Sequence, residues 1–258
     1  MLESPRFGPP PKTFSLTRSV VRRSHAIIAP DGYINSNVPG WTGCTVNVLI
    51  NEQMGARLCQ TLVTLTEAGK LTGMTQASQI FFYVVAGQVE AAAHSAHKTL
   101  TAGQFVQVPV GQPYRFKDAT PGTQILTFHK IYEPLDGHPA PGVLWGEKDD
   151  SQVPVYMNDE ALRIQELLPN DPAFDMAVNI FTYNIGGNLP MVETHIMEHG
   201  LMYLEGQAIY MLDQCWYPVK KGDSIWMAPY CQQWATAMGQ EPSVYIYYKN
   251  VNRFPTAI

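Results

Sequence analysis

The sequence predicts an all-β protein made of two similar halves. Short runs of alternating apolar and polar residues recur along the chain, and Gly, Pro, Asn or Asp bounds each of them. Alternation with a period of two is typical of half-buried strands. Only residues 158–168 have a pattern that a helix could adopt, and that segment is short. The predicted strands cover residues 58–65, 80–85, 104–108, 124–131, 176–183, 206–212, 223–228 and 244–249.

A segment dense in turn-forming residues lies near the middle of the chain. Residues 134–142 contain Pro, Gly and Asp in close succession, which is the composition of a linker. We therefore predict an N-terminal domain over residues 1–133, a linker over residues 134–150 and a C-terminal domain over residues 151–258.

The two halves are related by an internal repeat. A constant shift of 119 positions, as between Gly206 and Gly87, aligns turn and strand residues of the second half with residues of the first. The aligned pairs are Gly206 with Gly87, Gly222 with Gly103, Gln233 with Tyr114, and Lys249 with Lys130. Each half is therefore expected to form one β-domain of the same kind.

The composition suits a folded protein and excludes one class of partner. The chain has 258 residues and is 45% hydrophobic, so it can bury enough apolar surface to offset the loss of chain entropy. It carries 17 basic and 22 acidic residues, which gives a formal net charge of −5. We therefore expect no nucleic-acid partner, because such partners require a basic surface.

The sequence also argues against a membrane or secreted protein. No apolar run reaches the roughly 18 residues that a membrane-spanning helix needs. The first residues do not form the apolar segment of a signal peptide. The four cysteines are far apart and form no Cys-x-x-Cys pair, so buried free thiols are expected. These observations favour a cytoplasmic protein.

Potential metal ligands are concentrated in the second half. The pattern there is Gly187-x5-Glu193-x-His195-x3-His199-x6-Gly206, followed by Gly222-x6-Pro229-x3-Gln233. On a single strand Glu193, His195 and His199 would share one face, and Gln233 would add a donor from another strand. A set of imidazole, carboxylate and amide donors without thiolate favours Mn²⁺ first and Fe²⁺ next.

This pattern resembles the two sequence motifs of the cupin family, G-x5-H-x-H-x3-4-E-x6-G and G-x5-P-x-G-x2-H. Here Glu and His have exchanged the outer places, and Gln233 stands where the last His is expected. The first half keeps the second motif, from Gly103 to Tyr114. At the ligand positions of the first motif it has Met74, Gln76 and Ile80, or Thr75, Ala77 and Phe81 if the alignment shifts by one residue. The resemblance implies a bicupin, with two tandem jelly-roll β-barrels of which only the second binds metal.

Within the cupins, the chain is similar to the (S)-ureidoglycine aminohydrolases, which are bicupins of purine catabolism. The similarity covers nearly the whole chain and is densest in residues 190–253. It implies Mn²⁺-dependent conversion of (S)-ureidoglycine and water to (S)-ureidoglycolate and ammonia, in the breakdown of allantoin and allantoate. It also implies a small-molecule ureide as the partner of the site, and we expect the barrels to assemble into a homo-oligomer.

The same resemblance assigns roles to individual residues. It implies that Glu193, His195, His199 and Gln233 bind the metal and that Tyr210, Tyr245 and Lys249 line the substrate. Glu193 and Gln233 would contact the substrate as well, and the catalytic residues would be Glu193, Tyr210 and Lys249.

Three other interpretations were weighed. The run from His195 to His199 also fits His-x-x-Glu-His, a metallopeptidase pattern, but Pro190 and Gly200 leave too little room for the helix that it requires. An Fe²⁺-dependent cupin dioxygenase and a non-catalytic ligand-binding bicupin both stay open. The identity of the bound metal and the release of ammonia would discriminate them.

Overall fold

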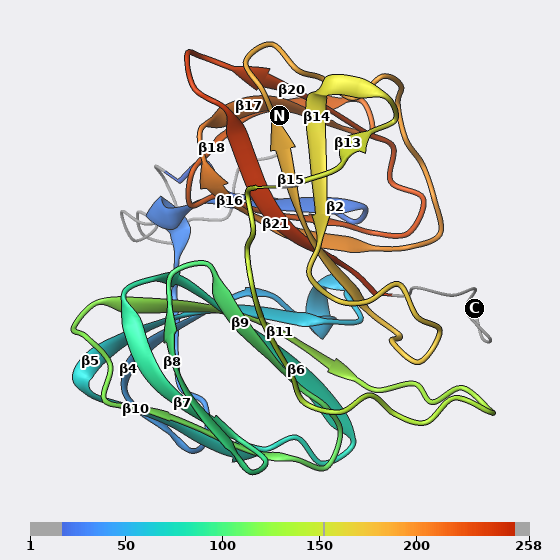
Figure 1. The fold of residues 1–258 in the computed structure, drawn as a ribbon. Coiled ribbons are helices and arrows are strands. Elements are labelled where there is room, and N and C mark those ends of the chain that lie inside the picture. The colour runs from blue at the N-terminus through green and yellow to red at the C-terminus, as the bar shows by residue number, and fades with distance from the viewer. Residues whose placement is uncertain (1–16, 152, 251–258) are drawn as a thin grey trace, which may run out of the picture.

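Nearly all regular elements of the protein are β-strands, as its computed structural model shows for residues 17–151 and 153–250. One part of the structure is a ten-stranded sheet, and the other combines an eight-stranded and a three-stranded sheet. Figure 1 shows these sheets curled into two barrels, one above the other. The predicted all-β fold class of two jelly-roll barrels is confirmed.

The strands of the first barrel pair in the order β12-β9-β6-β11-β5-β10-β7-β8, with β4 paired to β5 and to the short β3. Their bounds are β3 (Asn35–Ser36), β4 (Trp41–Ile50), β5 (Cys59–Met74), β6 (Ser78–Ala86), β7 (Gln88–Ala93), β8 (Ala96–Thr101), β9 (Gln104–Val108), β10 (Pro113–Lys117), β11 (Thr123–Ile131) and β12 (Leu144–Glu147). Two short 3-10 helices accompany them, η1 (Pro30–Gly32) and η2 (Glu52–Met54).

The second barrel combines a sheet in the order β1-β2-β19-β16-β21-β15-β14-β13 with a sheet in the order β18-β17-β20. Its strands are β1 (Val20–Val21), β2 (His25–Ile28), β13 (Val155–Tyr156), β14 (Asp159–Glu166), β15 (Ala177–Tyr183), β16 (His199–Glu205), β17 (Gln207–Leu212), β18 (Cys215–Lys220), β19 (Ser224–Met227), β20 (Gln233–Met238) and β21 (Ser243–Lys249). The segment with a helix-like pattern, residues 158–168, contains strand β14.

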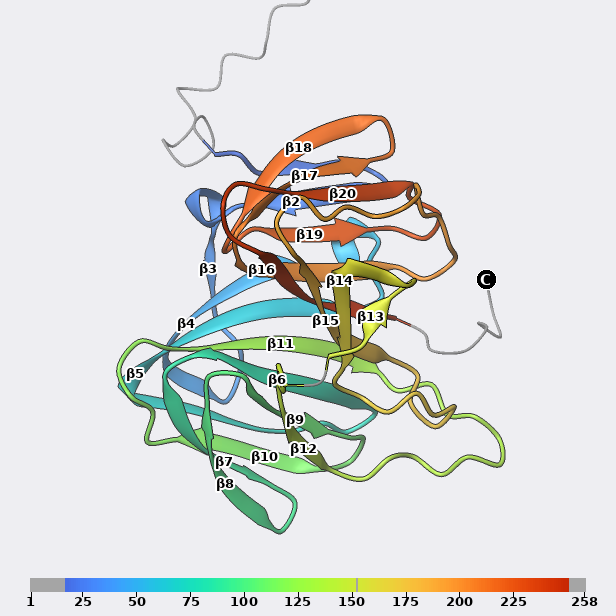
Figure 2. The same ribbon diagram turned by 45° about the horizontal axis from the view of Figure 1, so that its top comes forward.

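The buried apolar side chains of the strands form three clusters. One fills the first barrel and includes Phe82 and Phe116, and another lies in the second barrel around Phe181 and Leu201. The third joins residues of both halves, for example Phe128 and Tyr248, whose ring centroids lie 5.2 Å apart. Because this third cluster is continuous, the barrels pack face to face, as Figure 2 shows.

Two strand pairings cross the division that we predicted at residues 133 and 150. Strand β2, from the beginning of the chain, pairs with β19 of the second barrel. Strand β12 lies inside the predicted linker and pairs with β9 of the first barrel. Each barrel thus includes a strand from outside the residue range that we predicted for it. The domain limits stay a prediction, and residues 1–16, 152 and 251–258 lie outside the described part of the chain.

Within the described residues, no helix is long and apolar enough to cross a membrane.

Candidate active site

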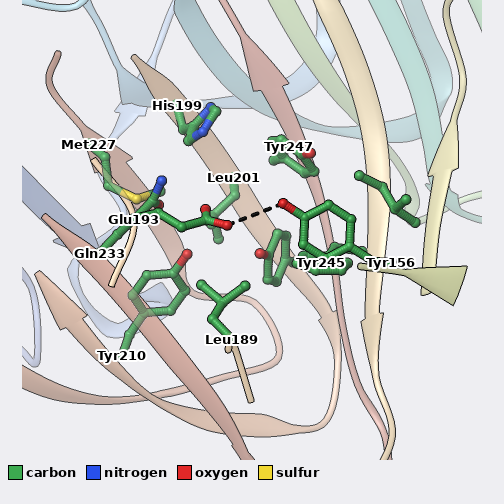
Figure 3. Close-up of a pocket in the computed structure, with 12 residues that line it drawn as sticks. Tyr156, Leu189, Glu193, His199, Leu201, Tyr210, Met227, Gln233, Tyr245 and Tyr247 are labelled. Atoms are coloured by element: carbon green, nitrogen blue, oxygen red, sulfur yellow. Dashed lines mark hydrogen bonds between the residues drawn. The ribbon is translucent and has the colours of Figure 1, made fainter. Parts of the chain in front are cut away.

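A small cavity of about 40 Å³ opens inside the second barrel. One side of it is polar and the other is apolar and aromatic (Figure 3). The residues that line it are Tyr156, Ile164, Phe181, Leu189, Glu193, His199, Leu201, Tyr210, Met227, Gln233, Tyr245 and Tyr247. Five predicted site residues, Glu193, His199, Tyr210, Gln233 and Tyr245, are therefore brought to one cavity.

The segment that carries the predicted ligands is not the continuous strand we expected. Glu193 forms an isolated bridge with Gln233, in which the backbone N–H of each donates to the carbonyl oxygen of the other at 2.9 Å. The chain then bends at residues 196–197, and β16 begins only at His199. The ring Nδ1 of His195 lies 2.9 Å from the Met197 carbonyl oxygen across this bend. The expected alternation along one strand was therefore wrong.

The two histidines nevertheless meet. Their Nε2 atoms are 3.0 Å apart, and Gln233 Nε2 lies 2.9 Å from Nε2 of His195. The Nδ1 of His199 faces the Tyr248 carbonyl oxygen at 3.0 Å. Since a carbonyl can only accept, each Nδ1 must carry the ring proton, and each Nε2 then presents a lone pair.

Two lone pairs that face each other favour a cation between them. Burial lowers the pKa of His199 to about 3, with His195 adding to the effect, so the ring stays neutral. Neutral imidazoles whose Nδ1–H groups bond backbone carbonyls are the usual form of histidine ligands. The His195 and His199 rings therefore fit a divalent metal ion. Gln233 turns its amide nitrogen toward His195, and a half-turn of the amide brings its oxygen to the same place as a further ligand.

Glu193 lies in the same cavity but its carboxylate is turned toward another partner. Tyr156 donates a hydrogen bond of 3.2 Å to Glu193 Oε1, as Figure 3 shows. Burial, followed by the charge of Glu193, raises the pKa of Tyr156 to about 12, so this hydroxyl stays a donor. The role of Glu193 as a fourth ligand stays a prediction.

Neighbouring contacts hold this segment in place. The Glu198 carboxylate is fully buried and accepts hydrogen bonds from the Arg57 backbone N–H at 2.9 Å and from the Tyr248 hydroxyl at 3.1 Å. Arg57 belongs to the first half, so the first barrel helps to fix the strand that begins at His199. Burial raises the pKa of Glu198 to about 7. In the sequence Glu198 stood out only as the acid of the His-x-x-Glu-His pattern, which did not predict its burial.

The aromatic wall combines predicted and unexpected tyrosines. Tyr210 and Tyr245 line the cavity, and the Tyr245 and Tyr183 hydroxyls lie 3.1 Å apart. Burial raises the pKa of Tyr210 and Tyr245 well above the ordinary value, so both hydroxyls stay protonated. Tyr156 and Tyr247 were not predicted. Tyr247 could have been found because it shares a strand face with Tyr245, whereas Tyr156 carried no signal.

Lys249 ends strand β21 on the face that also carries Tyr245 and Tyr247. It is half-buried and lies close enough to His199 to help lower the pKa of that ring. It is not among the residues that line the cavity. Because Lys249 lies beside the polar side of the cavity, its predicted role in substrate binding stays a proposal.

The structure corrects the residue that we aligned with Lys249. In the second barrel Tyr203 pairs with Tyr245 and His199 with Lys249. In the first barrel the corresponding partners are Val84 with Ile125 and Ile80 with His129. The counterpart of Lys249 is therefore His129, because β11 and β21 are related by a shift of one residue more than the rest of the repeat.

Lys130 instead points away from the interior of the first barrel. Its ammonium group lies 2.5 Å from Asp175 Oδ2 and 3.0 Å from Glu133 Oε1. The Gln79 side-chain amide also donates to Asp175. This buried network links the first barrel to a segment of the second half.

Aromatic rings fill the corresponding part of the first barrel. Tyr114, at the position matching Gln233, accepts a hydrogen bond of 3.2 Å from the Trp41 indole N–H. Its ring packs against Phe82 and Phe116 at centroid distances of 5.1 and 6.4 Å. His94 and His97 lie exposed on the hairpin between β7 and β8.

A second group of possible metal ligands lies outside the cavity. In the described residues, ligand atoms of His25, Asp213 and Cys231 lie within 4.8 Å of one another. Ser24 donates to Asp213 and lies 3.1 Å from Nδ1 of His25, while the Tyr217 hydroxyl lies 2.9 Å from Nε2. Because one tautomer of His25 satisfies all of these groups, the cluster is complete without an ion. Cys231 is a buried free thiol, as the sequence predicted.

The fold and the site together define a bicupin with one polar cavity. Solved structures support this class. Protein Ylba from E. coli is 29% identical, with a TM-score of 0.81 over 93% of this chain and 96% of that chain. A putative glyoxylate-induced protein from Pseudomonas aeruginosa is 27% identical, with a TM-score of 0.85 over 94% and 93%. Oxalate decarboxylase from Bacillus subtilis, 12% identical with a TM-score of 0.67 over 95% of this chain and 81% of that chain, shares the fold.

Curated relatives narrow the class. The (S)-ureidoglycine aminohydrolase of Arabidopsis thaliana is 33% identical over 240 residues, which are 93% of this chain and 80% of the plant protein. The (S)-ureidoglycine aminohydrolase of Escherichia coli is 32% identical over 241 residues, 92% of each chain. No family model matches the sequence. The chain belongs to the (S)-ureidoglycine aminohydrolase family, which confirms the resemblance noted from its motifs.

Proposed function

We propose that this protein converts (S)-ureidoglycine and water to (S)-ureidoglycolate and ammonia, with Mn²⁺ as its metal, in the cytoplasm. The observation that carries the proposal is the convergence of His195, His199 and Gln233 at one side of a tyrosine-lined cavity. We infer the identity of the substrate from the family, whose curated relatives are named (S)-ureidoglycine aminohydrolase.

His195, His199 and Gln233 would hold the ion, with Glu193 as the fourth ligand from the same cavity. The donor set consists of nitrogen and oxygen atoms without thiolate, which suits Mn²⁺. A bound divalent ion supplies Lewis acidity and positive charge at this side of the cavity.

The remaining residues would bind and orient the substrate. The substrate carries a carboxylate, and the Lys249 ammonium group on the strand facing the cavity can pair with it. Tyr210 and Tyr245 are protonated, as their raised pKa values require, so they can donate hydrogen bonds to substrate oxygens. Gln233 contacts both the metal position and the cavity.

Release of ammonia breaks the carbon–nitrogen bond, while water forms a new carbon–oxygen bond at the same carbon and supplies the proton that the departing amine needs. Among the residues that line the cavity, Glu193 is the carboxyl group, and the Tyr156 hydroxyl holds it in position. Glu193 would carry this proton, and Tyr210 would fix the substrate while the carbon–nitrogen bond breaks. The buried walls limit the access of bulk water to the reacting carbon.

Two alternatives are less well supported. An Fe²⁺-dependent dioxygenase could use similar ligands, but the family membership favours hydrolysis. A non-catalytic binding protein would not need a proton carrier beside the metal ligands. The proposal includes a small ureide as ligand, no nucleic-acid or membrane partner, and assembly into a homo-oligomer. The net charge of −5 supports the exclusion of nucleic acid.

The direct test supplies freshly prepared ureidoglycine to the purified protein loaded with Mn²⁺ or Fe²⁺. The proposal expects ammonia above the spontaneous rate, without consumption of O₂, and the highest rate with Mn²⁺. Oxygen consumption with Fe²⁺ would support the dioxygenase, and binding without turnover would support the non-catalytic protein.

A further inference from the structure

Asn179 and Tyr247 form a hydrogen-bonded pair inside the second barrel. They are direct partners on the adjacent strands β15 and β21. Asn179 Nδ2 donates to the Tyr247 hydroxyl oxygen at 3.0 Å. Because the oxygen accepts this bond, the Tyr247 proton is free to be donated to another group. Tyr247 lines the cavity, and its ring centroid lies 5.3 Å from that of His199.

The Asn179 side chain keeps a polar atom without a partner. The residue is only 3% exposed, and its Oδ1 is buried with no hydrogen-bond partner. A buried polar atom that lacks a partner costs stability, and native proteins usually avoid it. Leucine would fill a similar volume without this cost. The asparagine is therefore better explained by the bond that it gives to Tyr247 than by packing.

The first barrel shows what a purely structural pair looks like at the same place. Strand pairing matches Asn179 with Thr61 and Tyr247 with Thr127, since Val63 pairs with Ile125 where Phe181 pairs with Tyr245. The hydroxyls of Thr61 and Thr127 bond each other at 2.7 Å. The barrel with the cavity thus has a long phenol and an amide where the filled barrel has two short, mutually bonded hydroxyls.

We propose that Tyr247 donates a hydrogen bond to an oxygen of the bound substrate, and that Asn179 is a positioning residue that sets the direction of this bond. Asn179 gives its N–H to the phenol oxygen and so leaves the phenol proton to the cavity. Lys249 follows Tyr247 by two positions on the same face, so both side chains would act on one end of the substrate. This assignment rests on the proposed function.

The experiment compares wild type, Tyr247→Phe, Asn179→Leu and the double variant, each loaded with Mn²⁺. Loss of one neutral hydrogen bond predicts a fall in kcat/KM of about tenfold for Tyr247→Phe and up to about tenfold for Asn179→Leu. The double variant should match Tyr247→Phe, because the two residues act through one bond. Metal content should be unchanged, and the Tm of Asn179→Leu should equal or exceed that of wild type.

A binding measurement gives a readout that does not depend on turnover. In calorimetric titrations with ureidoglycolate, both single variants should weaken binding without further loss in the double variant. The matched control is Thr127→Val in the first barrel, which should change neither kcat/KM nor binding.

Distinct results would overturn this inference or the proposed function. A lower Tm with unchanged kinetics for Asn179→Leu would show a merely structural role, and multiplied losses in the double variant would show that the residues act independently. Wild type that binds ureidoglycolate but releases no ammonia would contradict the proposed function, while the binding series would still decide the role of Asn179. Absence of binding by wild type would overturn both.

Discussion

The Nε2 atoms of His195 and His199 lie 3.0 Å apart, although the two residues are four positions apart and the chain bends between them. Each ring uses its other nitrogen on a backbone carbonyl, of Met197 and of Tyr248 respectively. The protein therefore fixes the ring orientations before any ion binds. Preorganised ligands of this kind favour tight metal binding, because little side-chain entropy is lost.

His195→Ala should abolish both metal binding and turnover while the barrel stays folded. The imidazole contacts the cavity residues His199 and Gln233 and is only partly buried, so its removal deletes a metal donor without opening a large core void. Elemental analysis and circular dichroism measure the two properties separately. The control is Tyr114→Phe, at the position in the first barrel that matches Gln233. This variant protein should bind as much metal as wild type. An unfolded His195→Ala protein would show that the residue is mainly structural.

Lys249→Met should lower kcat/KM by at least about tenfold, since a charge-assisted contact contributes roughly 1.5–3 kcal/mol. Metal content should not change, because the ammonium group is not a ligand. His129→Met is the matched control, since His129 occupies the corresponding strand position of the first barrel. Steady-state kinetics that are equal for Lys249→Met and wild type would rule out carboxylate binding by this residue.

Lys130→Met should destabilise the protein without changing kcat/KM of the folded enzyme. Lys130 and Asp175 are almost fully buried, and their charged groups lie 2.5 Å apart. Removing the lysine leaves a buried carboxylate without its ion pair, which costs about 3–5 kcal/mol. Urea unfolding measures the loss, and the double variant Lys130→Met with Asp175→Leu should recover much of it. Equal stability of Lys130→Met and wild type would contradict a structural role for the pair.

His25 should make the protein less stable as the pH falls below about 6.5. Burial lowers the pKa of His25 from its ordinary value of 6.5, while nearby Asp213 opposes this shift. Between 6.5 and the lowered value the unfolded chain binds the proton more readily than the folded one, so stability is present above this window and lost as the pH falls through it. The difference in unfolding free energy between pH 7.5 and 5.5 should shrink in His25→Gln. An unchanged difference would mean that other groups cause the pH dependence.

Sequence periodicity predicted strands because several barrel strands have one buried and one outer face, although β6, β15 and β19 are buried on both faces. The repeated pattern of burial in β7 and β17 is an example. The residues of the candidate site could also be predicted from the sequence. Metal-binding side chains are rare among the apolar residues of a barrel, so a regularly spaced group of them is easy to recognise. Glu193, His199 and Gln233 indeed line one cavity.

Three features could not be read from the chain for physical reasons. The bend at residues 196–197 changes how His195 reaches His199, and only backbone contacts reveal it. The one-residue shift between β11 and β21 moves the counterpart of Lys249 from Lys130 to His129, because a shift by one exchanges the two faces of a strand. Tyr156 reaches Glu193 from an edge strand 37 residues away, a contact without any local pattern.

The most direct test titrates Mn²⁺ into metal-free protein while ammonia and ureidoglycolate are measured from freshly prepared ureidoglycine. Because the second barrel alone presents the imidazole and amide donors in its cavity, activity should rise in proportion to bound Mn²⁺ and reach a plateau near one ion per chain. Ammonia and ureidoglycolate should form in equal amounts throughout the titration. Ammonia release that never exceeds the spontaneous rate at any Mn²⁺ loading would contradict the assignment of this protein as a metal-dependent ureidoglycine aminohydrolase.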